Sequence, residues 1–211
     1  KITPLMTRIM DATLVLHGEH TINASTFTAM VTSSTLANAS QVVASAIGSL
    51  SGPLHGGANE KVIAMLQKIE SKEEIRPWLD ETLKAKNVVW GMGHREYSVK
   101  DPRANILTDM VQELFEEREG GVTDIFDKAI ELEKACEEKL SHKGVYPNVD
   151  FYSGILYKEM DIPTDIFTPI FAMSRVSGWL AHWIEQIQDN KIFRPTPVSY
   201  THLTLPTTGV V

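Results

Sequence analysis

The chain has 211 residues, of which 43% are hydrophobic and 22% charged, and its net charge is −7. This length can bury a sizeable core in one or two domains. The acidic balance argues against a nucleic-acid backbone as partner, although anionic small ligands remain compatible with it. The single cysteine, Cys136, excludes an internal disulfide. With no signal peptide at the start and no long apolar run, we expect a soluble, cytoplasmic protein.

Apolar residues recur at helical spacing along most of the chain and predict an all-α fold. The first stripe runs from Leu5 to Leu16. Residues 25–50 then form a long run rich in Ala, Ser and Thr, which suits one closely packed helix ending at Gly52-Pro53.

The second part of the chain continues in the same way. Asn59 is placed to cap the next helix. The pattern then predicts helices over residues 73–85, 103–117, 123–142, 150–160 and 165–190, with one short strand or extended piece at 88–90.

A more charged segment at residues 59–162 lies between apolar flanks at 1–58 and 163–198. This contrast predicts a lobe inserted between two parts of another domain. Residues 199–211 are rich in Thr and Pro without periodicity, so we set them aside as a non-native tail. The start at Lys1, without an initiator Met and almost directly before a helical pattern, suggests a fragment.

Three turns bounded by Gly or Pro each hold one ionisable residue. They are residues 52–59 with His55, residues 91–95 with His94, and residues 147–154 with Asp150. Glycine allows close backbone approach to a ligand, and two histidines with a carboxylate are equipment for acid–base chemistry.

Each of these residues also has a simpler interpretation. Asp150 stands where a helix N-cap would stand, and a single histidine in a loop is more often structural than catalytic. A histidine at a helix N-terminus, as predicted for His55, is kept neutral by the dipole and can donate a hydrogen bond without carrying charge. The pair His17 and His20 is weak evidence for a metal site, because no third ligand follows from the spacing.

The strings around these residues closely resemble the active-site motifs of the citrate synthase family. The similarity runs from about Ile9 to Val198. It implies the C-terminal part of that family's two-domain helical fold. Residues 1–58 and 163–198 would belong to the large domain and 59–162 to the small, mobile, CoA-binding domain. The first helices of the large domain have no counterpart here.

The resemblance implies a role for each matching residue. His55, His94 and Asp150 would be catalytic. The residues implied for CoA are Gly91, Gly93 and Arg95. The residues implied for oxaloacetate are His20, Asn23, Arg103, Arg175 and Arg194, the last reaching into the neighbouring subunit of a homodimer or higher oligomer. No metal and no permanently bound cofactor is implied.

The implied reaction condenses acetyl-CoA with oxaloacetate and water to give citrate and CoA. Two alternatives stay open. A methylcitrate synthase using propionyl-CoA shares these motifs, and only the shape of the acyl pocket would tell the two apart. The chain could instead be an inactive helical fragment that dimerises through its helices of small residues.

Overall fold

The computed structural model describes residues 2–94, 97, 99–117 and 121–194, and in these residues it contains helices and no named strand. The all-α prediction is therefore confirmed. The α-helices are α1 (Pro4–Gly18), α2 (Ala24–Ser34), α3 (Ala39–Leu50), α4 (Ala58–Lys68), α5 (Ile75–Lys84), α6 (Pro102–Glu117), α7 (Asp124–Leu140), α8 (Val149–Glu159) and α9 (Phe167–Gln188). Short 3-10 turns precede α5 and α9 and follow α7.

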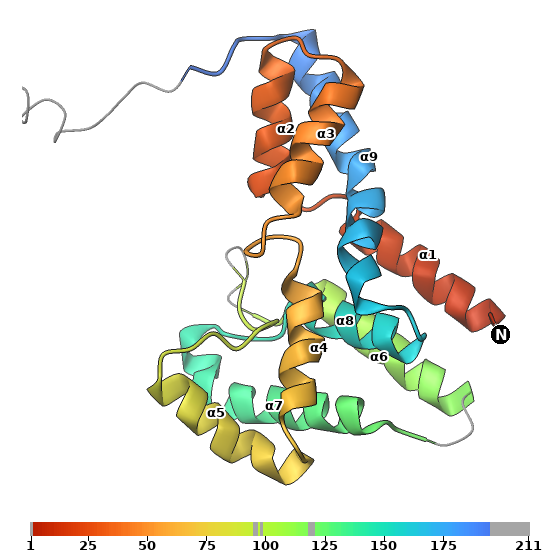
Figure 1. Ribbon diagram of the computed structural model, residues 1–211, viewed down its shortest axis with the longest axis vertical. Helices are drawn as coiled ribbons and strands as arrows, with labels where there is room; N and C mark the ends of the chain where they lie inside the picture. Colours follow the sequence, from red (N-terminus) through yellow and green to blue (C-terminus); the bar gives the residue numbers. More distant parts are fainter. Residues whose placement is uncertain (1, 95–96, 98, 118–120, 195–211) are drawn as a thin grey trace, which may run out of the picture.

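The helices form two packed groups joined by the longest one. In Figure 1, α2, α3 and the second half of α9 make an upper bundle, and α4 to α8 lie below it. α8 packs between α4 and α6, and α5 packs on α7. α1 crosses to contact both α9 and α6, so it links the two groups.

Each group has its own buried core. The large cluster is the core of α4 to α8 with the starts of α1 and α9, and it is built from big side chains such as Leu66, Leu107 and Phe151. The small cluster belongs to the upper bundle, and its buried members are Ala29, Val42, Ala46, Leu50, Phe171 and Trp179. The alanines let α2 and α3 approach closely, as the small-residue composition predicts.

The expectation of one helix over residues 25–50 is wrong. α2 ends at Ser34, and Leu36 adopts a left-handed φ of 62°. Asn38 then starts α3 with a capping box. Its side chain accepts from the backbone amide of Gln41, and the Gln41 side chain accepts from the backbone amide of Asn38. This reciprocal cap satisfies two orphan donors and starts a new helix inside an apolar run.

Two further local predictions need correction. Gly57, not Asn59, is the N-cap residue of α4, and Asn59 is buried in the first turn. Residues 88–90 form no strand; the nearest ladder contact is an isolated antiparallel bridge between Met92 and Pro147. Among the described helices, none has the length and apolar character needed to cross a membrane. Residues 199–211 lie outside the described part of the chain.

Candidate active site

A cleft of about 810 Å³ opens where the two groups of helices meet. Four short pieces of chain line it: residues 20–27 before and in α2, the turn at 54–58, the segment 88–94, and the start of α8. Four ionisable residues predicted from sequence therefore share one cavity, namely His20, His55, His94 and Asp150. Asn23, Gly91 and Gly93 line it as well.

Backbone pairing between two turns sets the place of His94 and Asp150. The Gly93 amide donates to the Tyr146 carbonyl at 2.7 Å, and the Asn148 amide donates to the Gly91 carbonyl at 2.9 Å. The Asn148 side chain adds a third bond, from Nδ2 to the Gly93 carbonyl at 2.9 Å. His94 follows directly after one paired turn and Asp150 directly after the other, so one wall of the cleft holds both.

Glycine is required at the start of this wall. Gly91 has φ +79°, and a Cβ there would stand 2.8 Å from side-chain atoms of both Val62 and Phe151. Gly93 has φ +85° in more open space. Left-handed backbone at both positions favours glycine, so Gly91 and Gly93 shape the cleft through the path of the chain.

Asp150 is the second residue of α8 and does not cap it. The N-cap is Asn148, whose side chain accepts from the Asp150 amide at 3.0 Å. The carboxyl group of Asp150 is thereby left to face the cleft. Burial raises its pKa to about 6, although the charges of Arg103 and Arg175 oppose the rise.

His55 is held as a neutral imidazole in contact with Ser25. The Ser25 amide donates to Nε2 of His55 at 3.2 Å. An amide can only donate, so this contact favours the tautomer in which Nε2 accepts and Nδ1 carries the ring proton. Burial, with the charge of Arg175, lowers the pKa of His55 and keeps the ring neutral.

Ser25 links His55 to the upper bundle through its hydroxyl. The hydroxyl donates to Asn23 Oδ1 at 2.8 Å and accepts from Trp179 Nε1 at 3.2 Å, and its oxygen lies 2.8 Å from His55 Nε2. Ser25 was not predicted from sequence as a site residue. Its position at the first turn of α2, facing another chain segment, could not be read from the local sequence.

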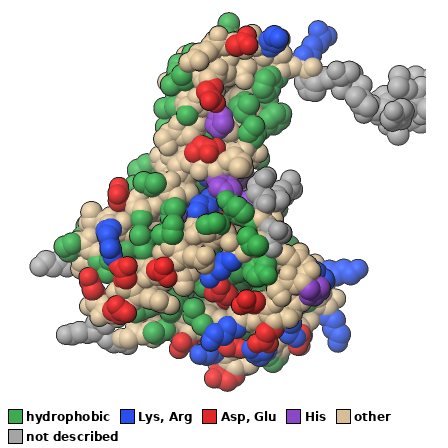
Figure 2. All heavy atoms as spheres, turned by 180° about the vertical axis from the view of Figure 1, so that it is seen from behind, with side chains coloured by type: hydrophobic (Ala, Val, Ile, Leu, Met, Phe, Trp, Pro, Cys, Tyr) green, Lys and Arg blue, Asp and Glu red, His purple; other side chains and the backbone are tan. Residues whose placement is uncertain are grey.

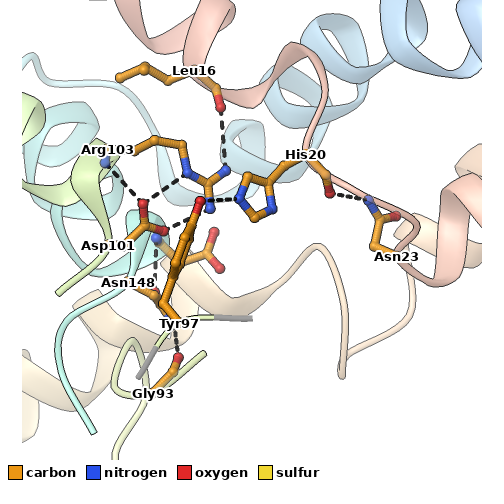
Figure 3. A network of polar contacts seen from close by, with 9 residues as sticks. Leu16, His20, Asn23, Gly93, Tyr97, Asp101, Arg103 and Asn148 are labelled. Carbon is orange, nitrogen blue, oxygen red and sulfur yellow. Dashed lines mark hydrogen bonds and ion pairs between the residues drawn. The ribbon is translucent and has the colours of Figure 1, made fainter. Parts of the chain in front are cut away.

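His20, His94 and Tyr97 form one aromatic group at the cleft. The Tyr97 hydroxyl lies 2.8 Å from His20 Nε2 (Figure 3), and the His20 and His94 rings meet edge to face at 5.2 Å. The His94 ring lies 4.8 Å from that of Tyr97. Burial, and then the charge of Arg103, lower the pKa of His20. Tyr97 was missed from sequence; its place three residues after His94 in the same turn was the available signal.

Arg103 is fixed by the buried carboxylate of Asp101. Its Nη2 and Nε donate to the two carboxylate oxygens at 2.7 and 3.1 Å, and its Nη1 donates to the Leu16 carbonyl at 3.4 Å (Figure 3). Burial alone would raise the pKa of Asp101, but the hydrogen bonds and charge of Arg103 outweigh burial and lower it. Arg103 is thereby a rigid cation beside His20.

Arg175 is almost fully buried, with 3% of its surface exposed. Its Nε donates to the His17 carbonyl at 2.6 Å, and its guanidinium carbon lies 4.8 Å from the centre of the Phe171 ring. Burial and the nearby Arg103 lower the pKa of Arg175 to about 10, which leaves it charged at neutral pH. Two neighbouring arginines in an acidic chain suit an anion with two carboxylates.

Of the predicted site residues that the structure describes, Arg103, Arg175 and Arg194 are not among those that line the cleft. Arg194 lies past the end of α9, in a second hollow of about 540 Å³ lined also by Phe27 and Phe193. Arg95 lies outside the described residues. In the described part of the chain, no three His, Cys, Asp or Glu side chains are grouped as a metal site would need.

These groups define an acid–base site for an anionic substrate on an all-helical fold: a carboxylate with a raised pKa, neutral imidazoles, and a pair of arginines. The family model described as "Citrate synthase, C-terminal domain" matches residues 1–196. The chain belongs to the citrate synthase family.

Individual relatives agree with this assignment. The chain is 54% identical over 195 residues to citrate synthase from Synechocystis, covering 92% of this chain and 49% of that protein. It is 46% identical over 192 residues to the one from Haloferax volcanii, covering 90% and 49%. The chain thus spans about half the length of the curated relatives it matches.

Solved structures show the same fold. Citrate synthase from Thermotoga maritima superposes with a TM-score of 0.86 at 40% identity, covering 95% of this chain and 54% of that one. A ternary complex of carboxymethyl coenzyme A and oxaloacetate with the Thermoplasma acidophilum enzyme superposes with a TM-score of 0.87 at 35% identity, covering 94% and 53%.

Proposed function

We propose that the natural protein containing this chain condenses acetyl-CoA with oxaloacetate and water to give citrate and CoA. The observation that carries the proposal is the pairing of residues 91–93 with 146–148. It holds His94 and Asp150 on one wall of a cleft that His20 and His55 line from other segments.

In this proposal Asp150 removes a proton from the methyl group of the thioester. The acidity of that methyl group is far too low for a carboxylate alone, so the enolate must be stabilised as it forms. His55 would do this through Nδ1–H, the nitrogen left as donor by the Ser25 amide. A preorganised donor of this kind contributes roughly 3–4 kcal/mol to a transition state. Its neutral ring avoids forming an ion pair with the enolate.

The new carbon–carbon bond forms when the enolate attacks the ketone carbon of oxaloacetate. His94 would donate a proton to the ketone oxygen as it becomes a hydroxyl. Arg103 and Arg175 would bind the two carboxylates, with His20 and Asn23 beside them. Water then cleaves the thioester of the citryl-CoA intermediate and releases CoA.

Gly91 and Gly93, with Arg95, would border the CoA thioester, and residues 59–162 would close over it to exclude water before condensation. We also propose a homodimer in which Arg194 completes the site of the partner subunit. The position of Arg194 away from its own cleft supports this arrangement. A cytoplasmic location stays a prediction, and the proposal includes no permanently bound cofactor.

A thiol-release assay tests the function. The natural protein is supplied with acetyl-CoA and oxaloacetate, and CoA release and citrate are measured together. We expect equal amounts of both products, and no release when oxaloacetate is left out. Propionyl-CoA in place of acetyl-CoA forms a second arm. Faster turnover with propionyl-CoA would make the protein a methylcitrate synthase, and no release with either thioester would contradict the proposal.

A further inference from the structure

The end of α1 lies in a groove along one face of α9, close to the point where the two helices cross in Figure 1. Five residues form this face at spacings of three, one, three and four, so they share one side of the helix: Phe171, Ser174, Arg175, Gly178 and His182.

Side chains along this face form polar contacts with the end of α1 and the residue that follows it. The Ser174 hydroxyl donates to the Leu14 carbonyl, and Arg175 Nε donates to the His17 carbonyl at 2.6 Å. Beyond the helix end, His182 Nε2 lies 3.3 Å from a carboxylate oxygen of Glu19. Among the last carbonyls of α1, which have no partner inside the helix, those of His17 and Gly18 accept from Arg175 and Ser177 of α9, and that of Leu16 accepts from Arg103 of α6.

Gly178 is the point of closest approach in this groove. A Cβ built at Gly178 would stand 2.5 Å from the Gly18 carbonyl oxygen and 3.1 Å from Glu19 Cγ. The nearer atom belongs to the backbone and cannot rotate away, so any side chain at Gly178 would push the end of α1 off the helix. Glycine weakens the middle of a helix, so its presence in α9 indicates a packing requirement.

The end of α1 at Gly18 is followed directly by residues of the proposed oxaloacetate site. His20 follows Gly18 by two residues, and Asn23 follows it by five and caps α2. Arg175, on the other side of the contact, sits one turn before Gly178 on the same face of α9. The distance between His20 and Arg175 therefore depends on how closely the backbone at Gly18 lies against Gly178.

We propose that Gly178 is a positioning residue that sets the spacing between Arg175 and the pair His20 and Asn23, and through it the affinity for oxaloacetate. This inference rests on the proposed function. Gly178 touches no substrate in it. Its effect falls on the dicarboxylate, while the proton-transfer group Asp150 and the CoA side of the cleft come from other segments.

The test compares Gly178→Ala with Gly48→Ala in the natural protein. Gly48 is also inside a helix, α3, but a Cβ there would meet nothing within 4 Å. Oxaloacetate Kd is measured by calorimetry, and KM for each substrate and kcat by thiol release. A misplacement of about 1 Å costs up to about a hundredfold in a catalytic site. We expect Gly178→Ala to raise oxaloacetate Kd and KM at least tenfold with acetyl-CoA KM within about twofold, and Gly48→Ala to match wild type.

A milder pair of variants keeps the test usable where Gly178→Ala does not fold. Glu19→Ala removes the carboxylate that contacts His182 Nε2, while Glu185→Ala removes the exposed carboxylate 3.7 Å from Nδ1 of the same ring. We expect Glu19→Ala to raise oxaloacetate Kd about threefold and Glu185→Ala to leave it unchanged.

The possible failures are distinguishable. Wild-type protein that neither binds oxaloacetate nor releases thiol contradicts the proposed function, and this inference falls with it. Active wild type with unchanged oxaloacetate Kd in folded Gly178→Ala overturns the positioning role alone. Equal weakening of both substrates would also overturn it, because a general loss of fold predicts that result.

Discussion

The large and small clusters of this molecule are built in different ways. The large cluster fills α4 to α8 with big aliphatic and aromatic side chains, and its outer surface carries ion pairs such as Arg76 with Glu131 and Glu138. The small cluster has few large side chains, and buried hydroxyls bond backbone within α2, as Ser33 does to the Ala29 carbonyl. Figure 2 shows mixed charges over the lower part and apolar side chains along the upper bundle.

The residues of the proposed site come from both groups of helices. Asp150 and His94 come from turns on the large-cluster side, where two short loops pair through backbone bonds. Arg175 and Ser25 come from close-packed helices of the small-cluster side. Arg175 donates to the His17 carbonyl there, and the backbone amide of Ser25 donates to His55. In the proposed function the large-cluster side would supply proton transfer and, through Arg103 in α6, part of the anion site, while the small-cluster side would supply Arg175 and the contact that orients His55.

The exposed surfaces differ as well. On the upper bundle, Phe27 is 54% exposed, Leu36 68% and Ile47 42%. Isolated apolar side chains on a surface need no explanation, but several on one bundle favour an interface. This supports the proposed homodimer, with Arg194 close to Phe27 in the second hollow.

Asp150→Ala gives the largest expected effect, because it removes the proposed base from the large-cluster side. We expect kcat to fall by about a hundredfold or more, with oxaloacetate Kd within about twofold, since Asp150 binds no part of oxaloacetate in the proposed function. Steady-state thiol release and calorimetry measure the two quantities. Turnover within about threefold of wild type would mean that the carboxyl of Asp150 has no part in the chemistry.

Arg175→Lys tests the small-cluster side. Lysine keeps the charge but loses the planar fork, and burial pushes its lower starting pKa towards neutrality. We expect oxaloacetate Kd to rise about thirtyfold, with a smaller change in kcat, as for loss of bidentate hydrogen bonds to a charged group. Arg76→Lys is the matched control, because Arg76 also binds carboxylates through its fork but lies on the surface. Equal Kd in Arg175→Lys and wild type would remove Arg175 from the substrate site.

The pH profile separates the two sides without mutation. The base works only when ionised, and the pKa of Asp150 is raised to about 6 by burial. kcat/KM should therefore fall about tenfold per pH unit below about pH 6. Burial lowers the pKa values of His20 and His55, so both rings are neutral at pH 7, where the plateau above that limb lies. A limb centred near pH 4, the ordinary range of a carboxyl, would contradict the raised pKa of Asp150.

Helical periodicity was enough to predict the all-α fold, because apolar stripes report which face of each helix is buried. It failed where a local polar contact interrupts an apolar run. Asn38 caps α3 inside the segment 25–50, which composition alone describes as continuous. Asn148 takes the cap position that the simpler interpretation gave to Asp150. In both cases, which of several neighbouring residues caps the helix depends on the backbone angles at each of them.

His55, His94 and Asp150, which do line the cleft, could be found from sequence because their turns have strong local signals in Gly and Pro. What sequence could not supply are the contacts between distant segments. The bond from Ser25 to His55 joins residues 30 positions apart, and the bond from Tyr97 to His20 joins residues 77 apart. The pKa of Asp150 depends on burial by the whole fold, so a local pattern cannot predict its direction.

Ser25→Ala gives the smallest expected effect and tests how the small-cluster side supports His55. The variant loses the hydroxyl that accepts from Trp179 Nε1 but keeps the backbone amide that donates to His55 Nε2. The tautomer of His55 is therefore kept, and we expect kcat to fall only about fivefold, the value of one neutral hydrogen bond. Because the buried Trp179 N–H loses its partner, stability should fall by roughly 1–3 kcal/mol.

Ser45→Ala is the matched control for this variant. Ser45 also belongs to the upper bundle, where its hydroxyl donates to the Val42 carbonyl and lies 2.9 Å from the hydroxyl of Thr32. Its loss leaves no buried N–H without a partner, so we expect a smaller fall in stability and unchanged kcat. Denaturant unfolding and thiol release measure both variants. A fall in kcat of a hundredfold in Ser25→Ala would show that the hydroxyl, and not the amide, fixes the ring of His55, and would reverse the tautomer assigned to it.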